Sequence, residues 1–363
     1  MTSGPLSLAT VEVHAEGEPC RVILDAGHLV HGDTMAERLA YCRAHLQWLR
    51  ELVLHEPRGY PALCAVLLLP PVSPGADFGM VVLEQGGFTP MSGSNTMCAV
   101  AGAVAAGLLT PDSAALDVTI DTAVGTVTAR AEIRDGRVAA VTVSNVPAYV
   151  VGLDIPVDVP GIGTVPVDVV FGGQFFAQAR AADCGVDLDP ARGRDLARAG
   201  ALVKMAARQQ VEVRHPTNPD ITDIALVMLH SGTPVPGVDA RNTVVLTQDP
   251  LAPDRPETWT GILDRSPCGT GTCGRMAALH ARGDLAIGAE FRHRSIIDSL
   301  FTGRLTATTE VAGRPAVVPT VTGRTWVTGH ATWHLDPTDP FPSGYTVGDL
   351  WAPGSRPTRP PAG

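Results

Sequence analysis

Apolar and polar residues alternate along much of the chain, and this alternation predicts β-strands. In the first half the predicted strands are residues 7–13, 21–24, 65–69, 79–84, 117–121, 124–133 and 137–144. In the second half they are residues 165–170, 221–229, 243–246, 305–311, 317–321 and 325–334. Helical spacing predicts helices from Met35 to about Leu54 and over residues 195–213. The order of strands and helices recurs in both halves, which predicts an α/β protein built from two similar parts.

Two segments rich in small residues interrupt this pattern, and each leads into a helix. Residues 90–96 contain Ser92 and precede the apolar run 97–108, while residues 264–275 contain Cys268 and precede a helix over 276–282. A glycine- or serine-rich turn that opens a helix exposes backbone N–H groups, and these form a site for a small anion. The positive end of the helix also favours the thiolate form of a cysteine there. Two such segments predict two halves that face one pocket.

Length and charge narrow the classes of protein and partner. The 363 residues suffice for two domains, and 45% hydrophobic residues with a net charge of −10 are typical of a soluble globular protein. With 27 basic against 37 acidic residues, we expect neither a nucleic acid nor an acidic membrane as partner. The apolar run 62–70 is shorter than the roughly 20 residues of a membrane-spanning helix. We see no signal peptide and expect a cytoplasmic protein.

The cysteines and the lysine bear on cofactors. The seven cysteines are scattered and odd in number, which argues for free thiols rather than a disulfide framework. No pair has zinc-finger spacing, and Cys268 and Cys273 do not form a C-x-x-C motif, so we expect no metal. Lys204 is the only lysine, and nothing around it resembles a pyridoxal-phosphate site. The residues themselves therefore predict neither a metal site nor a pyridoxal-phosphate site.

Together these segments resemble the proline racemase family, within the wider diaminopimelate-epimerase-like fold. The family motif D-R-S-P-C-G-T-G-T is complete over 264–272. The first family motif, M-C-G-H-G-T, stands here as M-S-G-S-N-T over 91–96, so that Ser92, Ser94 and Asn95 replace a cysteine, a histidine and a glycine. Shorter similarities occur at His14–Pro19, Phe171–Ala177, Asp239–Asn242 and Phe341–Tyr345.

The resemblance implies a fold and a division into domains. It implies two pseudo-symmetric domains, each a β-sheet or barrel around a central helix, with the active site in the interdomain cleft. We expect residues 1–150 plus 330–363 to form the first domain and residues 151–329 to form the second. The boundary is placed near residues 147–163, which are rich in proline and glycine.

The resemblance also implies roles for individual residues. In the family two acid/base groups flank the substrate α-carbon, and Cys268 and Ser92 stand at these positions. A serine hydroxyl is a poor base unless another group activates it, so Ser92 could instead act as a helix N-cap or protonate a departing group. Asp264 is expected to contact the ring ammonium, and Asp239 has no assigned role. The residues expected to bind the substrate are Gly93, Ser94, Asn95, Asp264, Gly269 and Thr270.

The Ser/Cys pair resembles hydroxyproline enzymes. The sequence therefore predicts cofactor-independent α-proton abstraction from a hydroxyproline, with trans-3-hydroxy-L-proline dehydratase as the main expectation, with or without hydroxyproline 2-epimerase activity. The alternative is a 4-hydroxyproline 2-epimerase or proline racemase in which Ser92 is the second acid/base. A third alternative is a non-catalytic imino-acid-binding protein, against which the retained Asp264 and Cys268 argue. A small imino acid is the expected partner, and a homodimer is left open.

Overall fold

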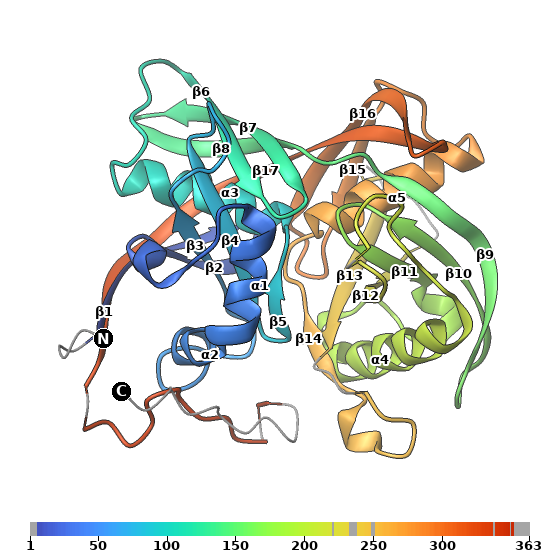
Figure 1. Ribbon diagram of the computed structural model, residues 1–363. Helices are drawn as coiled ribbons and strands as arrows, with labels where there is room; N and C mark the ends of the chain where they lie inside the picture. The colour runs from blue at the N-terminus through green and yellow to red at the C-terminus, as the bar shows by residue number, and fades with distance from the viewer. Residues whose placement is uncertain are drawn as a thin grey trace. The chain divides into compact units, whose positions relative to one another are not determined.

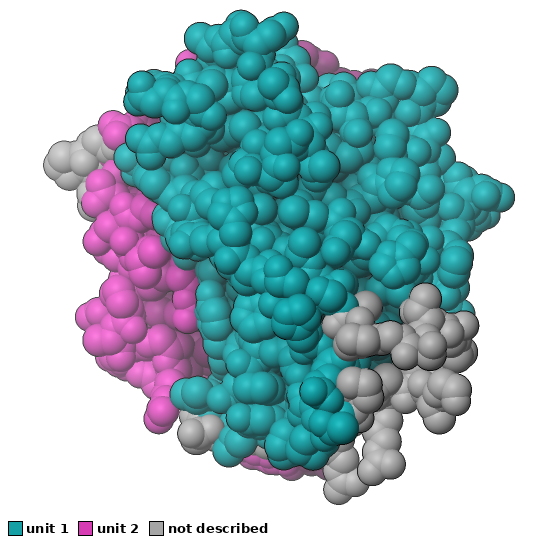
Figure 2. All heavy atoms as spheres, turned by 90° about the vertical axis from the view of Figure 1, so that its left-hand side faces the viewer, with its two compact units in different colours: residues 1–141, 324–363 teal, residues 142–323 magenta. Residues whose placement is uncertain are grey.

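The computed structural model describes residues 6–219, 221–231, 238–247, 251–336, 338–348 and 350–351. By its internal contacts the chain divides into two compact units, unit 1 (residues 1–141 and 324–363) and unit 2 (residues 142–323). Figure 2 shows unit 1 in teal and unit 2 in magenta. The predicted domains, 1–150 plus 330–363 and 151–329, stay a prediction, because compactness does not show that a unit folds alone.

The described residues form strands β1 to β17 and helices α1 to α5. The strands of the first part are β1 (Leu6–Ala15), β2 (Glu18–Ile23), β3 (Cys64–Leu69), β4 (Phe78–Glu84), β5 (Gly87–Thr89), β6 (Ala115–Thr122), β7 (Gly125–Arg134) and β8 (Arg137–Ser144). The strands of the second part are β9 (Tyr149–Val159), β10 (Gly163–Phe171), β11 (Phe175–Arg180), β12 (Ile224–His230), β13 (Ala240–Thr247), β14 (Gly261–Leu263), β15 (Glu290–Arg294), β16 (Leu300–Val311) and β17 (Arg314–Leu335). The α-helices are α1 (Met35–His45), α2 (Gln47–Leu54), α3 (Gly93–Ala105), α4 (Gly193–Gln210) and α5 (Gly269–Arg282).

Strand pairing repeats between the two units. In unit 1, β1 is antiparallel to β2, β2 parallel to β3, β3 antiparallel to β4, β4 parallel to β6 and β6 antiparallel to β7. In unit 2, β10, β11, β12, β13, β15 and β16 pair in the same order with the same directions. This repeat confirms the predicted pair of pseudo-symmetric halves.

The parallel pairs explain where the helices lie. Parallel neighbours need a crossover connection, which is usually helical. Helix α3 connects β4 to β6 and α5 connects β13 to β15, so the two helices occupy corresponding places. Figure 1 shows each of them among the strands of its own unit: α3 contacts β1, β2, β3 and β7, and α5 contacts β9, β10, β11 and β16.

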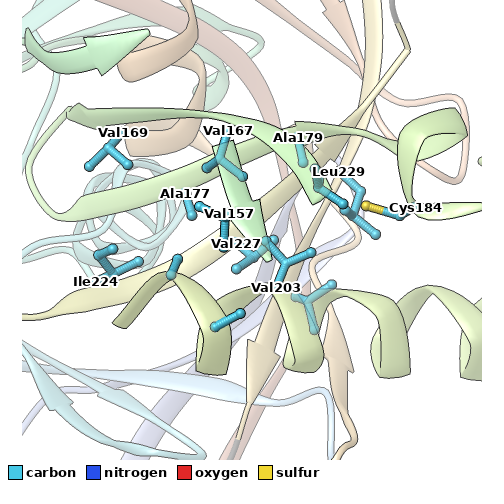
Figure 3. Close-up of a cluster of buried hydrophobic side chains, with 14 of the residues drawn as sticks. Val157, Val167, Val169, Ala177, Ala179, Cys184, Val203, Ile224, Val227 and Leu229 are labelled. Carbon is cyan, nitrogen blue, oxygen red and sulfur yellow. The ribbon is translucent and has the colours of Figure 1, made fainter. Parts of the chain in front are cut away.

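Each unit has its own apolar core, which holds its helices in place. In unit 2, valine, alanine and leucine side chains of the sheet pack against one face of α4, as Figure 3 shows for Val167 and Val169 of β10, Val227 and Leu229 of β12, and Val203 of α4. In unit 1, the core on the side of α1 and α2 includes Leu39, Leu49 and Leu67. Burial of such side chains contributes roughly 1.5–3 kcal/mol each.

Two expectations from the sequence need correction. The helix predicted from Met35 to Leu54 is interrupted at Leu46, whose φ of −114° and ψ of 19° are not helical. This break lets Leu46 join the core that α1 and α2 share. The two strands predicted at 317–321 and 325–334 are one strand, β17, because Gly323 continues its extended backbone. The segment 147–163, near which the domain boundary is predicted, contains the long strand β9, which pairs with β10. The boundary stays a prediction.

Candidate active site

Cys268 stands immediately before α5. It is the N-cap residue, it is only 7% exposed, and its φ of 64° turns the chain sharply into the helix. The backbone N–H of Gly271 donates to its Sγ at 3.4 Å. A hydrogen bond from a backbone amide and the positive end of the helix both stabilise negative charge on the sulfur. The structure therefore directs a backbone donor and the positive end of α5 at this sulfur.

A short hydrogen-bonded turn holds Cys268 in this position. The Asp264 Oδ1 atom accepts from the backbone N–H of Ser266 at 2.8 Å and from its hydroxyl at 2.9 Å. The Ser266 Oγ atom in turn accepts from the backbone N–H of Cys268 at 3.1 Å. The Asp264 carboxylate is thus fixed beside the thiol. Its predicted contact with a ring ammonium stays a prediction.

A buried chain of hydrogen bonds, here called the relay, runs from Asn242 through His293 and Thr272 to the turn that carries Cys268. The Asn242 side-chain amide donates to Nε2 of His293 at 2.8 Å, which assigns the ring proton to Nδ1. Nδ1 then donates to Thr272 Oγ1 at 2.9 Å, and Thr272 donates to the carbonyl of Pro267 at 3.2 Å. Burial holds the pKa of His293 well below its usual value, so the ring stays neutral.

The sequence analysis did not assign roles to the relay residues. Asn242 ends the segment 239–242 that was noted for its similarity to the family, and Thr272 ends the complete motif, so both carried a signal. His293 carried none, because nothing in its local sequence connects strand β15 to the start of α5. Only the parallel pairing of β13 with β15 brings it beside Asn242.

The β10–β11 turn packs directly on the first turn of α5. A Cβ atom at Gly172 would lie 2.2 Å from the carbonyl oxygen of Thr270, so only glycine fits. The Gln178 side-chain amide donates to the carbonyl of Gly271 at 3.1 Å. Phe176 packs in the apolar cluster that contains Cys268. The segment 171–177, which is similar to the family, therefore packs against the first turn of α5 and helps to fix its position.

Ser92 occupies the corresponding position before α3. It is the N-cap residue with an extended backbone (φ −150°, ψ 128°), but its side chain makes no capping hydrogen bond. Its Oγ atom accepts instead from the side-chain amide of Asn95 at 2.9 Å. Thr96 bonds the Ser92 carbonyl through both its backbone N–H, at 2.9 Å, and its hydroxyl, at 2.7 Å. The hydroxyl of Ser92 is therefore held by a neighbouring side chain rather than by the helix backbone.

The remaining predicted site residues lie in the first turns of these two helices. The N–H groups in the first turn of a helix have no partner within the helix, so they can bind an anion. These residues are Gly93, Ser94 and Asn95 in α3 and Gly269 and Thr270 in α5, and all of them are buried. Their contact with a substrate carboxylate stays a prediction.

Asp239 and His14 have structural contacts. The Asp239 carboxylate, whose role was left open, accepts from the backbone N–H of Arg292 at 2.6 Å and so ties the start of β13 to β15. His14, which begins the segment 14–19 that is similar to the family, accepts from the backbone N–H of Gly17 at 3.2 Å and stacks on Trp326 with ring centroids 4.9 Å apart. Both sets of contacts fix turns and strand ends.

The other thiols differ from Cys268 in their surroundings. Burial raises the pKa of Cys42 and Cys273 to about 12 and that of Cys184 to about 11. Cys98 and Cys273 are buried within α3 and α5, as the sequence predicts. All seven cysteines are free thiols. The raised pKa values mean that the thiols of Cys42, Cys184 and Cys273 are protonated near neutral pH.

The described residues, 6–351 apart from the gaps given above, hold neither a metal-binding cluster nor a membrane-spanning helix. No group of three or more histidine, cysteine or acidic side chains there could hold a metal ion. In the same part of the chain, no helix combines the length and apolar character that crossing a bilayer requires.

Comparison with known proteins identifies the family. The family model described as proline racemase matches residues 10–346. The chain belongs to the proline racemase family. A 4-hydroxyproline 2-epimerase of Streptosporangium roseum is 40% identical over 337 residues, which cover 93% of this chain and 97% of that protein. The predicted resemblance is thereby confirmed.

Solved structures agree with this assignment. A hydroxyproline epimerase from Agrobacterium vitis with bound trans-4-hydroxy-L-proline has a TM-score of 0.88 and 34% identity, covering 96% of both chains. A probable proline racemase from Agrobacterium radiobacter with bound carbonate has a TM-score of 0.87 and 36% identity, covering 95% of this chain and 98% of that one. The comparisons confirm the mixed α/β fold and support an isomerase of the epimerase kind. They do not support a dehydratase.

Proposed function

We propose that this member of the proline racemase family is a 4-hydroxyproline 2-epimerase, which inverts the α-carbon of trans-4-hydroxy-L-proline to give cis-4-hydroxy-D-proline. The observation that carries the proposal is the matched placement of Cys268 and Ser92, each at the N-cap of the corresponding helix in its half of the molecule. The names of its relatives supply the substrate class. The proposal replaces the dehydratase as the main expectation.

The proposed binding mode uses the two helix starts and Asp264. The substrate carboxylate is taken up by first-turn N–H groups of α3 and α5, because these groups and the helix dipoles favour an anion. Asp264 faces the ring ammonium, whose positive charge matches the carboxylate. An imino acid is the only partner that the proposal requires.

In the proposed reaction, Cys268 and Ser92 together hold one proton both before and after the substrate is inverted. The Cys268 thiolate removes the α-proton from one face of the substrate, and the Ser92 hydroxyl delivers its own proton to the opposite face. Cys268 then carries a proton and Ser92 is an alkoxide. The reverse reaction starts from this second form and returns the first. Before the next turnover in the same direction, solvent water takes the proton from Cys268 and returns one to Ser92, which closes the cycle.

Electrostatic stabilisation has to supply much of the rate, because a proton α to a carboxylate is very weakly acidic. Charge that develops on the α-carbon and carboxylate meets N–H groups already oriented by the first turns of two helices. Preorganised donors of this kind contribute roughly 10²–10³-fold each in enzymes where they have been removed. The buried setting of Thr270 and Asn95, both about 2% exposed, strengthens these interactions.

Dehydration of trans-3-hydroxy-L-proline is a second candidate, which the serine at position 92 favours. Here Cys268 removes the α-proton and the 3-hydroxyl leaves as water after protonation, which gives an enamine that tautomerises to Δ1-pyrroline-2-carboxylate. This reaction needs one strong base only, whereas epimerisation needs a competent group on each face.

Incubation in deuterated water separates the candidates. The purified protein is given trans-4-hydroxy-L-proline, cis-4-hydroxy-D-proline, trans-3-hydroxy-L-proline and L-proline separately. We expect inversion with α-deuteration for both 4-hydroxyproline epimers, measured by chiral chromatography and NMR. Pyrroline formation without inversion would establish the dehydratase, and inversion of proline alone would establish a racemase. A Cys268→Ala variant serves as the inactive control.

A further inference from the structure

The contact between Asn95 and Ser92 is unusual for the start of a helix. An N-cap serine ordinarily accepts from the backbone N–H two or three residues later. Here Ser92 has the extended backbone of an N-cap residue, yet its Oγ atom accepts from the Asn95 side chain at 2.9 Å. Asn95 is the third residue of α3 and is 2% exposed, so its amide is fixed within the protein. The hydroxyl therefore has a dedicated donor.

This donor changes what the hydroxyl can do. With one lone pair of Oγ occupied by the amide, the O–H bond is free to point away from Asn95. When Ser92 gives up its proton, the same contact becomes a hydrogen bond to an anion, which is shorter and about twice as strong. The positive end of α3 acts in the same direction. An amide N–H cannot accept the proton itself, so Asn95 acts through Ser92.

Two of the three departures from the first family motif concern this contact. In the motif that this chain resembles, positions 92 and 95 carry cysteine and glycine, and here they carry Ser92 and Asn95. A glycine has no side chain to donate, and a thiol, being more acidic, needs less help to lose its proton. The weaker acid in this chain is thus accompanied by an added donor.

A second observation places Asn95 beside a ligand site. Among the described residues, the Asn95 Oδ1 atom is buried and has no hydrogen-bond partner. Buried acceptors are nearly always paired in folded proteins. A bound imino acid carries N–H and O–H donors, so its arrival would satisfy this atom. The amide would then connect the substrate to Ser92.

We propose that Asn95 is the positioning residue that enables Ser92 to act as the second acid/base, an inference that rests on the proposed 2-epimerase. Asn95 stabilises the alkoxide left after proton delivery and keeps the hydroxyl directed away from the helix. Without it, Ser92 protonates the carbanion slowly, whereas Cys268 still removes and returns a proton on its own face.

A double-mutant cycle tests this role with four proteins: wild type, Asn95→Ala, Ser92→Cys and Ser92→Cys/Asn95→Ala. We expect Asn95→Ala to lower kcat for inversion of 4-hydroxyproline about 10²–10³-fold when residue 92 is serine, the size of effect seen when a preorganised donor is lost. With cysteine at 92 the same substitution should change kcat less than about threefold, because a thiol does not depend on the donor. In deuterated water, Asn95→Ala should still exchange the α-proton of one epimer without inverting it.

A matched control separates this role from simple loss of structure. Thr96→Val removes the hydrogen bond from the Thr96 hydroxyl to the Ser92 carbonyl, in the same turn, without touching Ser92 Oγ. Its effect on kcat should be the same with serine or cysteine at 92. Equal losses for Asn95→Ala in both backgrounds, or an unchanged kcat in the serine background, would overturn the assignment. A wild-type protein that inverts no 4-hydroxyproline would overturn the proposed function, and this role with it.

Discussion

Helices α3 and α5 begin alike, but they hold their N-cap side chains differently. In α5 the backbone N–H of the third helical residue, Gly271, donates to Cys268 Sγ. In α3 the third helical residue is Asn95, and its side chain donates to Ser92 Oγ. The fourth residue of each helix is a threonine whose backbone N–H donates to the N-cap carbonyl at 2.9 Å, so the geometry around the difference is shared.

Under the proposed function, this difference matches two acids of unequal strength. A thiolate is supported sufficiently by a backbone donor, which every helix start provides. A serine hydroxyl needs a closer and stronger donor, and a side chain can supply it. The start of α5 therefore owes its chemistry to backbone geometry, whereas that of α3 depends on one replaceable side chain.

The largest effect should come from removing each N-cap side chain in turn. Cys268→Ala should lower α-proton exchange from both 4-hydroxyproline epimers about 10³-fold, because no strong base remains. Ser92→Ala should abolish inversion yet leave exchange from one epimer, because the thiolate can remove and return a proton on its own face. NMR in deuterated water measures both. Equal loss of all exchange in the two variants would show that the helix starts do not act on separate faces.

The next effect concerns the charge beside Cys268, which α3 lacks. Asp264→Asn keeps an acceptor for Ser266 but removes the negative charge, so we expect KM to rise about 10–100-fold, as for lost bonds to charged groups. Ser266→Ala removes the hydroxyl that bridges Asp264 to Cys268 and keeps the charge. It should change KM much less. If the two variants raise KM equally, Asp264 supports the turn and does not bind the ring ammonium.

Close packing on the two helices offers a third comparison. Gly172→Ala places a Cβ atom 2.2 Å from the Thr270 carbonyl, and Gly102→Ala places one 2.8 Å from a side-chain atom of Val22. Each should lower the free energy of unfolding by about 1–3 kcal/mol, as overpacking does. Gly172→Ala should also lower kcat/KM, because it displaces the first turn of α5. Urea unfolding and steady-state kinetics test this, and full activity of a destabilised Gly172→Ala variant would contradict it.

The smallest effect should come from the relay beneath α5. Thr272→Val loses the bonds to His293 and Pro267, so alkylation of Cys268 by iodoacetamide near neutral pH should slow about 2–10-fold, the value of one or two neutral hydrogen bonds. Thr272→Ser keeps the hydroxyl and should restore the rate. The high pKa values of Cys42, Cys184 and Cys273 keep these thiols from competing. Rates that are identical for valine and serine would remove the relay from any role at the thiol.

The sequence by itself determined the features that depend on local spacing. Alternation of apolar residues predicts most strands, and the turn at Asp135–Gly136 has the positive φ at both residues that two-residue hairpins favour. The small residues around Ser92 and Cys268 predict helix starts, and both residues are N-caps in the structure. These features follow from backbone preferences within a few residues of chain.

Only the tertiary structure decided the rest. The break at Leu46 and the strand β9 within a proline-rich segment arise from packing that local propensity does not contain. His293 supports Cys268 because strand pairing brings together residues distant in sequence. Asn95 lies three residues from Ser92, yet whether its side chain or its backbone bonds the hydroxyl depends on how the buried first turn of α3 is packed. Side-chain rotamers and the pairing of distant strands depend on packing in the folded protein. The local pattern of residues along the chain therefore does not predict them.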